Sequence, residues 1–192
     1  IVNRAFAARK TADLSVYSDV NTSAWYYNDL ELAVAMRTFQ GANGKLNPET
    51  PITREEAFVV LARAFALESG DTSVLNHYTD GASVSAWARS SVAALIENGY
   101  VNGANGKLNP KTSITRAEFA AIAARFDDKN TDTSSKFTDI ASHWAKNEIG
   151  IAANEGWING YPDGTFRPNQ YITRAEAMTL VNRVLTRLPE NS

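Results

Sequence analysis

Seven residues recur three times along this chain at nearly even spacing. The copies read ITREEAF at 52–58, ITRAEFA at 114–120 and ITRAEAM at 172–178, and their arginines lie 62 and 58 residues apart. Self-similarity of this period is typical of repeat proteins, in which no unit buries its apolar face alone. We therefore expect three similar units that share one core.

Two more features recur in a fixed order before each copy. An aromatic-x-Asp triplet and a tryptophan precede a turn-rich loop, which reads QGANGKLNP, NGANGKLNP and NGYPDGTFRP in the three units. The recurring side chains are Asp19, Asp80 and Asp139, followed by Trp25, Trp87 and Trp144. These anchors place the repeats at 16–70, 71–132 and 133–192.

Residues 1–15 precede the first repeat. Their first six letters, IVNRAF, align with LVNRVL at 180–185, in the helix that follows the third copy of the motif. We expect residues 1–15 to be the last helix of a preceding repeat or a linker. We also expect residues 1–10 to be helical and packed on the body, because their apolar stripe is otherwise exposed.

Each repeat is predicted to fold as helix, loop, helix. The first helix begins near its tryptophan, carries an apolar stripe at helical spacing and ends near a glycine such as Gly99 or Gly156. In repeat three we assign Trp144, Ile149 and Ala152 to that stripe. The ANG and PDG turns require positive φ near their glycine. A short extended segment should follow, kept from becoming helical by its proline.

The repeated motif begins the second helix. A threonine followed three residues later by a glutamate is a capping box, in which each side chain binds the other residue's backbone amide. The pairs are Thr53 with Glu56, Thr115 with Glu118 and Thr173 with Glu176. The apolar face behind each cap is only about two turns long, which is too short for an isolated helix. We expect these three helices to pack around a common axis in an all-α, mainly helical fold.

Capping does not explain the arginines of the motif, Arg54, Arg116 and Arg174. A cation in the first turn of a helix is unfavourable by roughly 0.3–1 kcal/mol. Its repetition in three repeats indicates an anionic partner. Two partners stay open, namely the aspartate of a neighbouring repeat, which makes the arginine structural, and an anionic ligand.

Composition narrows the classes of function. A formal net charge of −2 argues against a general nucleic-acid binder. The chain has no cysteine, and its two histidines, His77 and His143, lie in different repeats, so no metal or cofactor site is predicted. No run of 18 apolar residues occurs, which argues against membrane insertion.

Together these anchors resemble the S-layer homology (SLH) domain over roughly residues 16–188. Repeat three is close to the family pattern, with HWAKNEI followed by GWINGYPDGTFRPNQYITRAEAM. Repeats one and two depart from it, since both have GANGKLNP where the family favours GYPDGTFRP. Repeat one also has TFQG and TREE in place of the usual NG and TRAE.

The resemblance implies both a shape and a role. SLH repeats form a monomeric, intrachain pseudo-trimer, in which three helix-loop-helix units build a pseudo-threefold bundle with three prongs. They act as a non-catalytic anchor that binds a secondary cell-wall polysaccharide attached to peptidoglycan, often bearing ketal-linked pyruvate, in grooves between prongs. Such a module tethers an S-layer or surface protein outside the bacterial cell.

A sugar carboxylate suits an arginine fork, a helix N-terminus and glycine-rich loop amides, and tryptophan offers a flat face to a sugar ring. The candidate ligand-binding residues are Arg54, Arg116, Arg174, Gly103, Gly160, Trp25, Trp87, Trp144, Asp19, Asp80 and Asp139. Core burial stays open for the tryptophans, and capping or arginine pairing for the aspartates. Because repeat one departs from the pattern, we expect Arg116 and Arg174 to matter more for binding than Arg54, and their loss to cost little stability.

Two other functions compete with this interpretation. A carbohydrate hydrolase needs two carboxylates at a set separation, but the recurring glutamate is explained by capping, and no unrepeated polar cluster breaks the symmetry. A helical scaffold that binds other proteins of the surface layer is the stronger alternative, because solenoid repeats often present such surfaces.

Overall fold

The computed structural model describes residues 12–126 and 131–187, so the expectation for residues 1–10 lies outside the described residues. Each repeat contributes two α-helices, as predicted. They are α2 (Tyr27–Ala35) and α3 (Arg54–Ala64), α4 (Arg89–Glu97) and α5 (Arg116–Ala124), and α6 (Lys146–Asn154) and α7 (Arg174–Arg187). Two 3₁₀ segments, η1 (Thr72–His77) and η2 (Gly81–Ser83), precede α4. The described residues contain isolated β-bridges but no strand, which confirms the all-α class.

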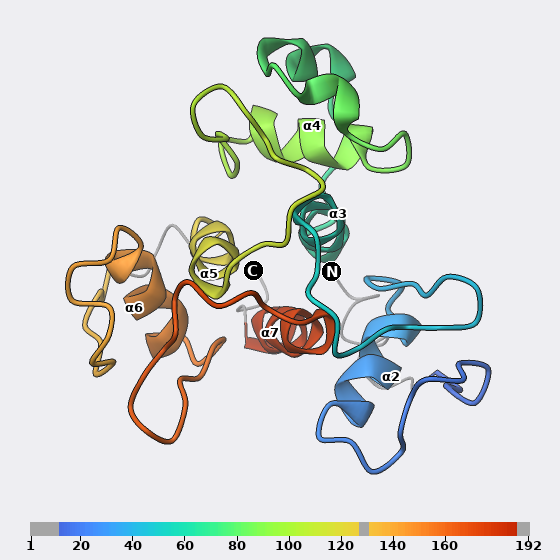
Figure 1. Ribbon diagram of the computed structural model, residues 1–192, viewed down its shortest axis with the longest axis vertical. Coiled ribbons are helices and arrows are strands. Elements are labelled where there is room, and N and C mark those ends of the chain that lie inside the picture. The colour runs from blue at the N-terminus through green and yellow to red at the C-terminus, as the bar shows by residue number, and fades with distance from the viewer. Residues whose placement is uncertain (1–11, 127–130, 188–192) are drawn as a thin grey trace, which may run out of the picture.

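The three helices that follow the repeated motif lie at the centre of the molecule. Figure 1 shows α3, α5 and α7 around a common axis, with α2, α4 and α6 on three outward prongs. The long loops of the repeats lie on the prongs and at one end of the central helices. The helices that follow the motif thus lie inside, and the helices that begin each repeat lie outside them.

Each prong helix packs mainly against the central helix of the preceding repeat. The α4 helix contacts α3, α6 contacts α5, and α2 contacts α7. Repeat three therefore provides the partner for the first helix of repeat one, which closes the chain into a ring. A single repeat contains none of these three helix pairs, so it cannot bury the apolar faces of its own helices.

All three capping boxes are formed. In repeat two, Glu118 N donates to Thr115 Oγ1 at 3.2 Å and Thr115 N donates to Glu118 Oε2 at 2.9 Å. The caps of repeats one and three have the same two bonds. Helix propagation thus starts at the predicted residue, and such a cap contributes about 1 kcal/mol.

The central helices are buried on more than the one face expected from periodicity. The predicted face of α3 (Ala57, Val60, Leu61, Ala64) is buried, and so are Phe58 and Val59 on other sides of the helix. A helix at the axis faces two other central helices and a prong at once, so apolar residues are needed around most of its surface. Phe126, at the end of the predicted face of α5, is only half-buried.

A closed ring of backbone hydrogen bonds joins the residues before the three caps. Ile52 N donates to Ile172 O at 3.1 Å, Ile172 N to Ile114 O at 3.2 Å, and Ile114 N to Ile52 O at 3.1 Å. All three isoleucine side chains are buried. Each repeat thus donates one of these backbone hydrogen bonds to one neighbouring repeat and accepts one from the other.

The turn of each loop has the predicted positive φ, but the next segment differs from expectation. Gly44, Gly106 and Gly164 adopt φ between 70° and 81°. The segment before each proline was expected to be extended, yet Asn47, Asn109 and Arg167 take φ of 49°, 50° and 58°. That expectation was wrong for these residues, because an aspartate described below binds their backbone amides and fixes a left-handed turn.

We predict that the protein unfolds in a single cooperative transition. Each of the main contacts between α-helices joins two repeats, so loss of one repeat removes the partner of another. Scanning calorimetry should therefore give a van't Hoff enthalpy equal to the calorimetric enthalpy. Two or three separate transitions, or a folded fragment that ends at residue 132, would contradict the closed arrangement.

Candidate functional site

Each motif arginine crosses to the next repeat and forms an ion pair with its capping glutamate. Nη1 and Oε1 are separated by 2.6 Å in Arg54–Glu118, 3.1 Å in Arg116–Glu176 and 2.5 Å in Arg174–Glu56. The partner is thus a glutamate and not the aspartate of the aromatic-x-Asp triplet, which was one of the two partners left open. The seven-letter motif recurs because its arginine and its glutamate face opposite neighbours around the ring.

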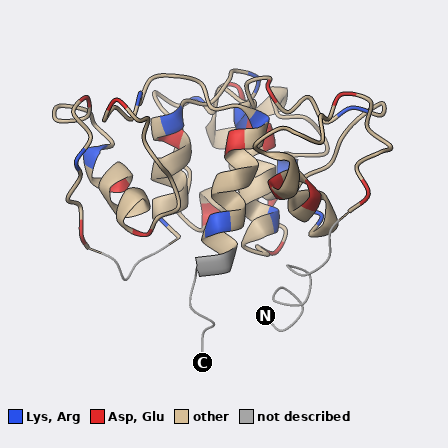
Figure 2. Cartoon of the chain, turned by 90° about the horizontal axis from the view of Figure 1, so that it is seen from below, with Lys and Arg blue, Asp and Glu red and all other residues tan. Residues whose placement is uncertain are grey.

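The same arginines also hold the loops. Arg54 Nε donates to Leu108 O at 2.8 Å, Arg116 Nε to Phe166 O at 3.0 Å, and Arg174 Nε to Leu46 O at 2.9 Å. Figure 2 shows the charged ends of the central helices close together beneath the loops. Because these arginine side chains are at most 12% exposed, they cross-link repeats rather than extend into solvent.

Each of the three recurring aspartates binds the backbone amide of the loop residue whose carbonyl accepts from a motif arginine. Asp80 accepts from Leu108 N at 2.9 Å and Asn109 N at 2.7 Å, while Arg54 binds the carbonyl of the same leucine. Asp19 and Asp139 bind the corresponding loop amides in repeats one and three. Both carboxylate oxygens are therefore used in fixing the loop, which favours the structural interpretation for these aspartates.

The amino ends of the central helices are also occupied by protein groups. Arg54 N donates to Thr112 O at 2.9 Å, and Glu55 N donates to Pro110 O at 3.0 Å. The third amide, Glu56 N, donates to Thr53 Oγ1 at 3.4 Å. Repeats two and three have matching bonds. The helix N-terminus, which the sequence suggested as a carboxylate site, has these donors already committed.

The tryptophans differ from the core interpretation. Trp25, Trp87 and Trp144 are 67%, 55% and 62% exposed, so the assignment of Trp144 to the apolar stripe of its helix was wrong and none of the three is a core residue. A fourth tryptophan, Trp157, is fully buried instead. Each helix starts two residues after its recurring tryptophan, which places that side chain outside the helical face that packs inward. The three indoles are therefore accessible to solvent at equivalent positions of the repeats.

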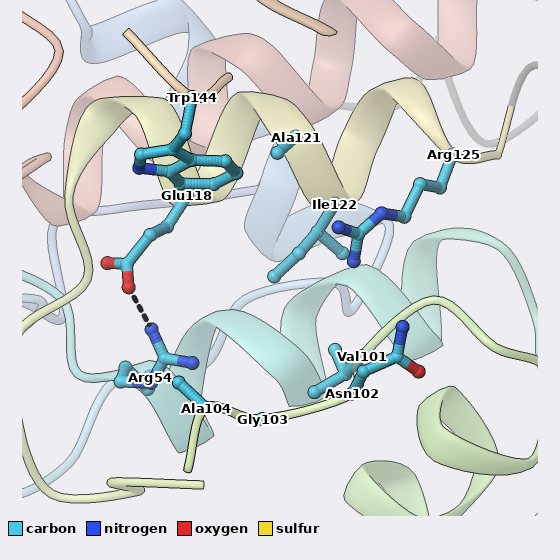
Figure 3. A pocket seen from close by; sticks show the side chains of 10 residues that line it. All are labelled: Arg54, Val101, Asn102, Gly103, Ala104, Glu118, Ala121, Ile122, Arg125 and Trp144. Atoms are coloured by element: carbon cyan, nitrogen blue, oxygen red, sulfur yellow. Dashed lines mark hydrogen bonds and ion pairs between the residues drawn. The ribbon is translucent and has the colours of Figure 1, made fainter.

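A groove of about 360 Å³ lies beside one of these tryptophans, where all three repeats meet (Figure 3). Arg54 comes from repeat one, the loop at 101–104 and α5 from repeat two, and Trp144 from repeat three. The residues that line it are Arg54, Val101, Asn102, Gly103, Ala104, Glu118, Ala121, Ile122, Arg125 and Trp144. The structure therefore brings together three predicted site residues, Arg54, Gly103 and Trp144.

Arg125 is a groove residue that the sequence reasoning missed. It is exposed, and its Nη1 donates to Tyr100 O at 2.7 Å. An arginine recurs nine residues after every motif arginine, at Arg63, Arg125 and Arg183. This recurrence is the signal that could have found it, but it lies outside the seven repeated letters.

The loop glycines have a structural requirement of their own. A Cβ atom on Gly103 would lie 2.5 Å from Lys107 O and 2.9 Å from the Tyr78 ring, and one on Gly160 would lie 2.2 Å from the Phe137 ring. Only glycine lets the loop approach the aromatic residue of the aromatic-x-Asp triplet. Within the described part of the chain, the Gly103 amide donates no hydrogen bond, so it is available at the groove wall.

The groove lies at Arg54, although the sequence favoured Arg116 and Arg174 over Arg54. Nη2 of Arg54 makes no hydrogen bond among the described residues, whereas Nη2 of Arg116 donates to Asn159 O at 3.1 Å. The ranking of the three arginines for ligand binding stays a prediction. Among the described residues no cluster of three potential metal ligands occurs, and no described helix is long and apolar enough to cross a membrane.

Comparison with known proteins defines the class. The family model described as S-layer homology domain matches residues 16–58, 77–120 and 136–178, which together make up more than half of the chain. The chain therefore belongs to the S-layer homology domain family, with three tandem repeats.

Three relatives show the same relationship. The chain is 36% identical over 156 residues to a Cellulosome-anchoring protein of Acetivibrio thermocellus, covering 77% of this chain and 35% of that protein. It is 37% identical over 163 residues to Cell surface glycoprotein 1 of the same organism, covering 78% and 7%. It is 36% identical over 130 residues to the Surface-layer 125 kDa protein of Lysinibacillus sphaericus, covering 65% and 11%. The chain thus spans at most 35% of the length of these relatives.

We predict that Arg54→Ala lowers the free energy of unfolding by about 2–3 kcal/mol, because it leaves a partly buried glutamate and a loop carbonyl without their donor. The matched control is Arg63→Ala in the same helix, an exposed arginine whose loss should cost about 0.5 kcal/mol or less. Urea denaturation of both variants measures the difference. Equal free energies of unfolding for the two variants would mean that the first position of the helix tolerates other residues in place of arginine.

Proposed function

We propose that this chain is a non-catalytic anchoring module that binds an anionic polysaccharide attached to peptidoglycan. The observation that carries the proposal is the groove whose lining includes the exposed Trp144, Arg125 and the loop at Gly103. An aromatic wall with a few fixed polar groups is typical of small-molecule and sugar sites. The groove would hold one sugar residue of the polymer at a time.

The charges in the groove favour an anionic sugar. Arg54 and Glu118 neutralise each other at 2.6 Å, which leaves Arg125 as the uncompensated charge of the lining. A guanidinium with free donors binds a carboxylate through charge-assisted hydrogen bonds. A ketal-linked pyruvate on the sugar would supply such a carboxylate, with Nη2 of Arg54 as a second donor.

The role at the cell surface rests on the relatives. Their names describe an anchoring protein, a cell surface glycoprotein and a surface-layer protein. We propose that this chain likewise tethers a larger surface protein to the bacterial wall. The activity of that larger protein would reside in segments outside the three repeats.

A protein-binding scaffold remains the second candidate, because exposed Trp25, Trp87 and Tyr171 could also contact another protein. Wall sacculi assayed before and after acid extraction of the polysaccharide separate the two functions. We expect binding before extraction and none after it. Retained binding would favour bare peptidoglycan or a protein partner.

We predict that Arg125→Gln weakens binding to intact sacculi by about 10- to 150-fold, which corresponds to a charged hydrogen bond of roughly 1.5–3 kcal/mol. Trp144→Ala should weaken binding as well, since it removes the flat wall of the groove. The matched control is Lys136→Gln, which removes one exposed positive charge away from the groove. If Arg125→Gln and Trp144→Ala bind intact sacculi as tightly as the control Lys136→Gln, the ligand does not occupy this groove.

A further inference from the structure

The three boundaries between repeats are built from equivalent parts, but the parts are not identical. Each boundary contains a motif arginine, the glutamate of the next repeat and the glycine-containing loop of that repeat. We infer that Tyr161 closes the groove at Arg116, whereas Ala104 and Ala42 leave the grooves at Arg54 and Arg174 open. The module then offers two ligand sites rather than three. This inference rests on the proposed function for its ligand but not for its geometry.

Backbone hydrogen bonds show that Tyr161 takes the place of the two alanines. Tyr161 N donates to Thr165 O at 2.8 Å, just as Ala104 N donates to Lys107 O at 2.8 Å and Ala42 N to Lys45 O at 3.0 Å. Each of the three residues directly follows the loop glycine. A phenol ring therefore projects from the position where the other two repeats have a methyl group.

Two guanidinium groups hold the Tyr161 ring. Cζ of Arg116 lies 5.0 Å from the ring centroid, and Cζ of Arg167 lies 3.8 Å from it. Arg167 Nη2 in turn donates to Asp163 Oδ2 at 3.0 Å. Hydrogen bonds from Thr165 and from Arg167 lower the pKa of Asp163 to about 2, so this partner stays ionised at neutral pH. Tyr161 is thus a fixed cover and not a free side chain.

Each nitrogen of the arginine beneath this cover already donates a hydrogen bond. Arg116 uses Nε for Phe166 O, Nη1 for Glu176 and Nη2 for Asn159 O. Its side chain is 5% exposed, compared with 12% for Arg54 and 11% for Arg174. Within the described residues, Nη2 of both other arginines makes no hydrogen bond. The repeat closest to the family pattern therefore supplies the closed groove.

Chemical labelling tests the geometry without any ligand. Phenylglyoxal modification followed by peptide mass spectrometry should find Arg116 the slowest of the three motif arginines. Tyr161→Ala should raise the rate at Arg116 several-fold and leave Arg54 unchanged, while Tyr161→Phe should behave like the wild type because the ring remains. If Arg116 reacts as fast as Arg54 in the wild type, the groove is not closed and the inference is overturned.

Calorimetric titration with a pyruvyl-ketal methyl hexoside counts the sites. We expect two per chain for the wild type, three for Tyr161→Ala and one for Ala104→Tyr, with Tyr171→Ala unchanged as the matched control. Thermal melts check that each variant is folded. Three equal sites in the wild type would overturn the inference. No binding to any variant would refute the carboxylate ligand of the proposed function, and the labelling rates would still decide whether Tyr161 closes its groove.

Discussion

The guanidinium group that crosses each repeat boundary is the contact on which the architecture depends. It joins the central helix of one repeat to both the capping glutamate and a loop carbonyl of the next repeat. Arg54, for example, binds Glu118 and Leu108 O. A cation at a helix N-terminus is unfavourable by itself, and the glutamate of the neighbouring cap offsets it. Because the three contacts form a cycle, removing one opens the ring at a repeat boundary and also frees a loop that lines a groove.

Local signals can be read from the sequence, and contacts between repeats cannot. The capping boxes and the helix starts depend on residues three or four positions apart, so spacing alone correctly pairs Thr115 with Glu118. The partner of Arg54 lies 64 residues away. No local sequence pattern indicates whether a partner at that separation is a glutamate or an aspartate. The assignment of Trp144 to the core fails for a similar reason, since a tryptophan that opens a helix has the same local pattern whether it faces the core or solvent.

At the position where repeat one departs from the repeated motif, the side chain binds residues of the neighbouring repeat. Glu55, which replaces the alanine of the other copies, is only 4% exposed. Its carboxylate accepts from Ser85 N and Ser85 Oγ, both at 2.9 Å, and from Lys111 Nζ at 2.6 Å. A buried charge of this kind is tolerated because it is fully paired. The TREE variant of repeat one therefore fixes the prong of repeat two, and it is no sign that repeat one has lost its role.

Folding and the candidate binding groove depend on the same boundaries between repeats. The groove at Arg54 takes one wall from each of the three repeats, so it exists only while the ring is closed. A ligand that binds only this closed form stabilises it by RT ln(1 + [L]/Kd), which is about 2.7 kcal/mol at a hundredfold excess over Kd. A sugar that contacts Arg54, Gly103 and Trp144 would therefore act as a further cross-link between repeats. For an anchor this coupling is useful, since opening the ring under load would require release of the wall polymer as well as loss of the inter-repeat ion pairs.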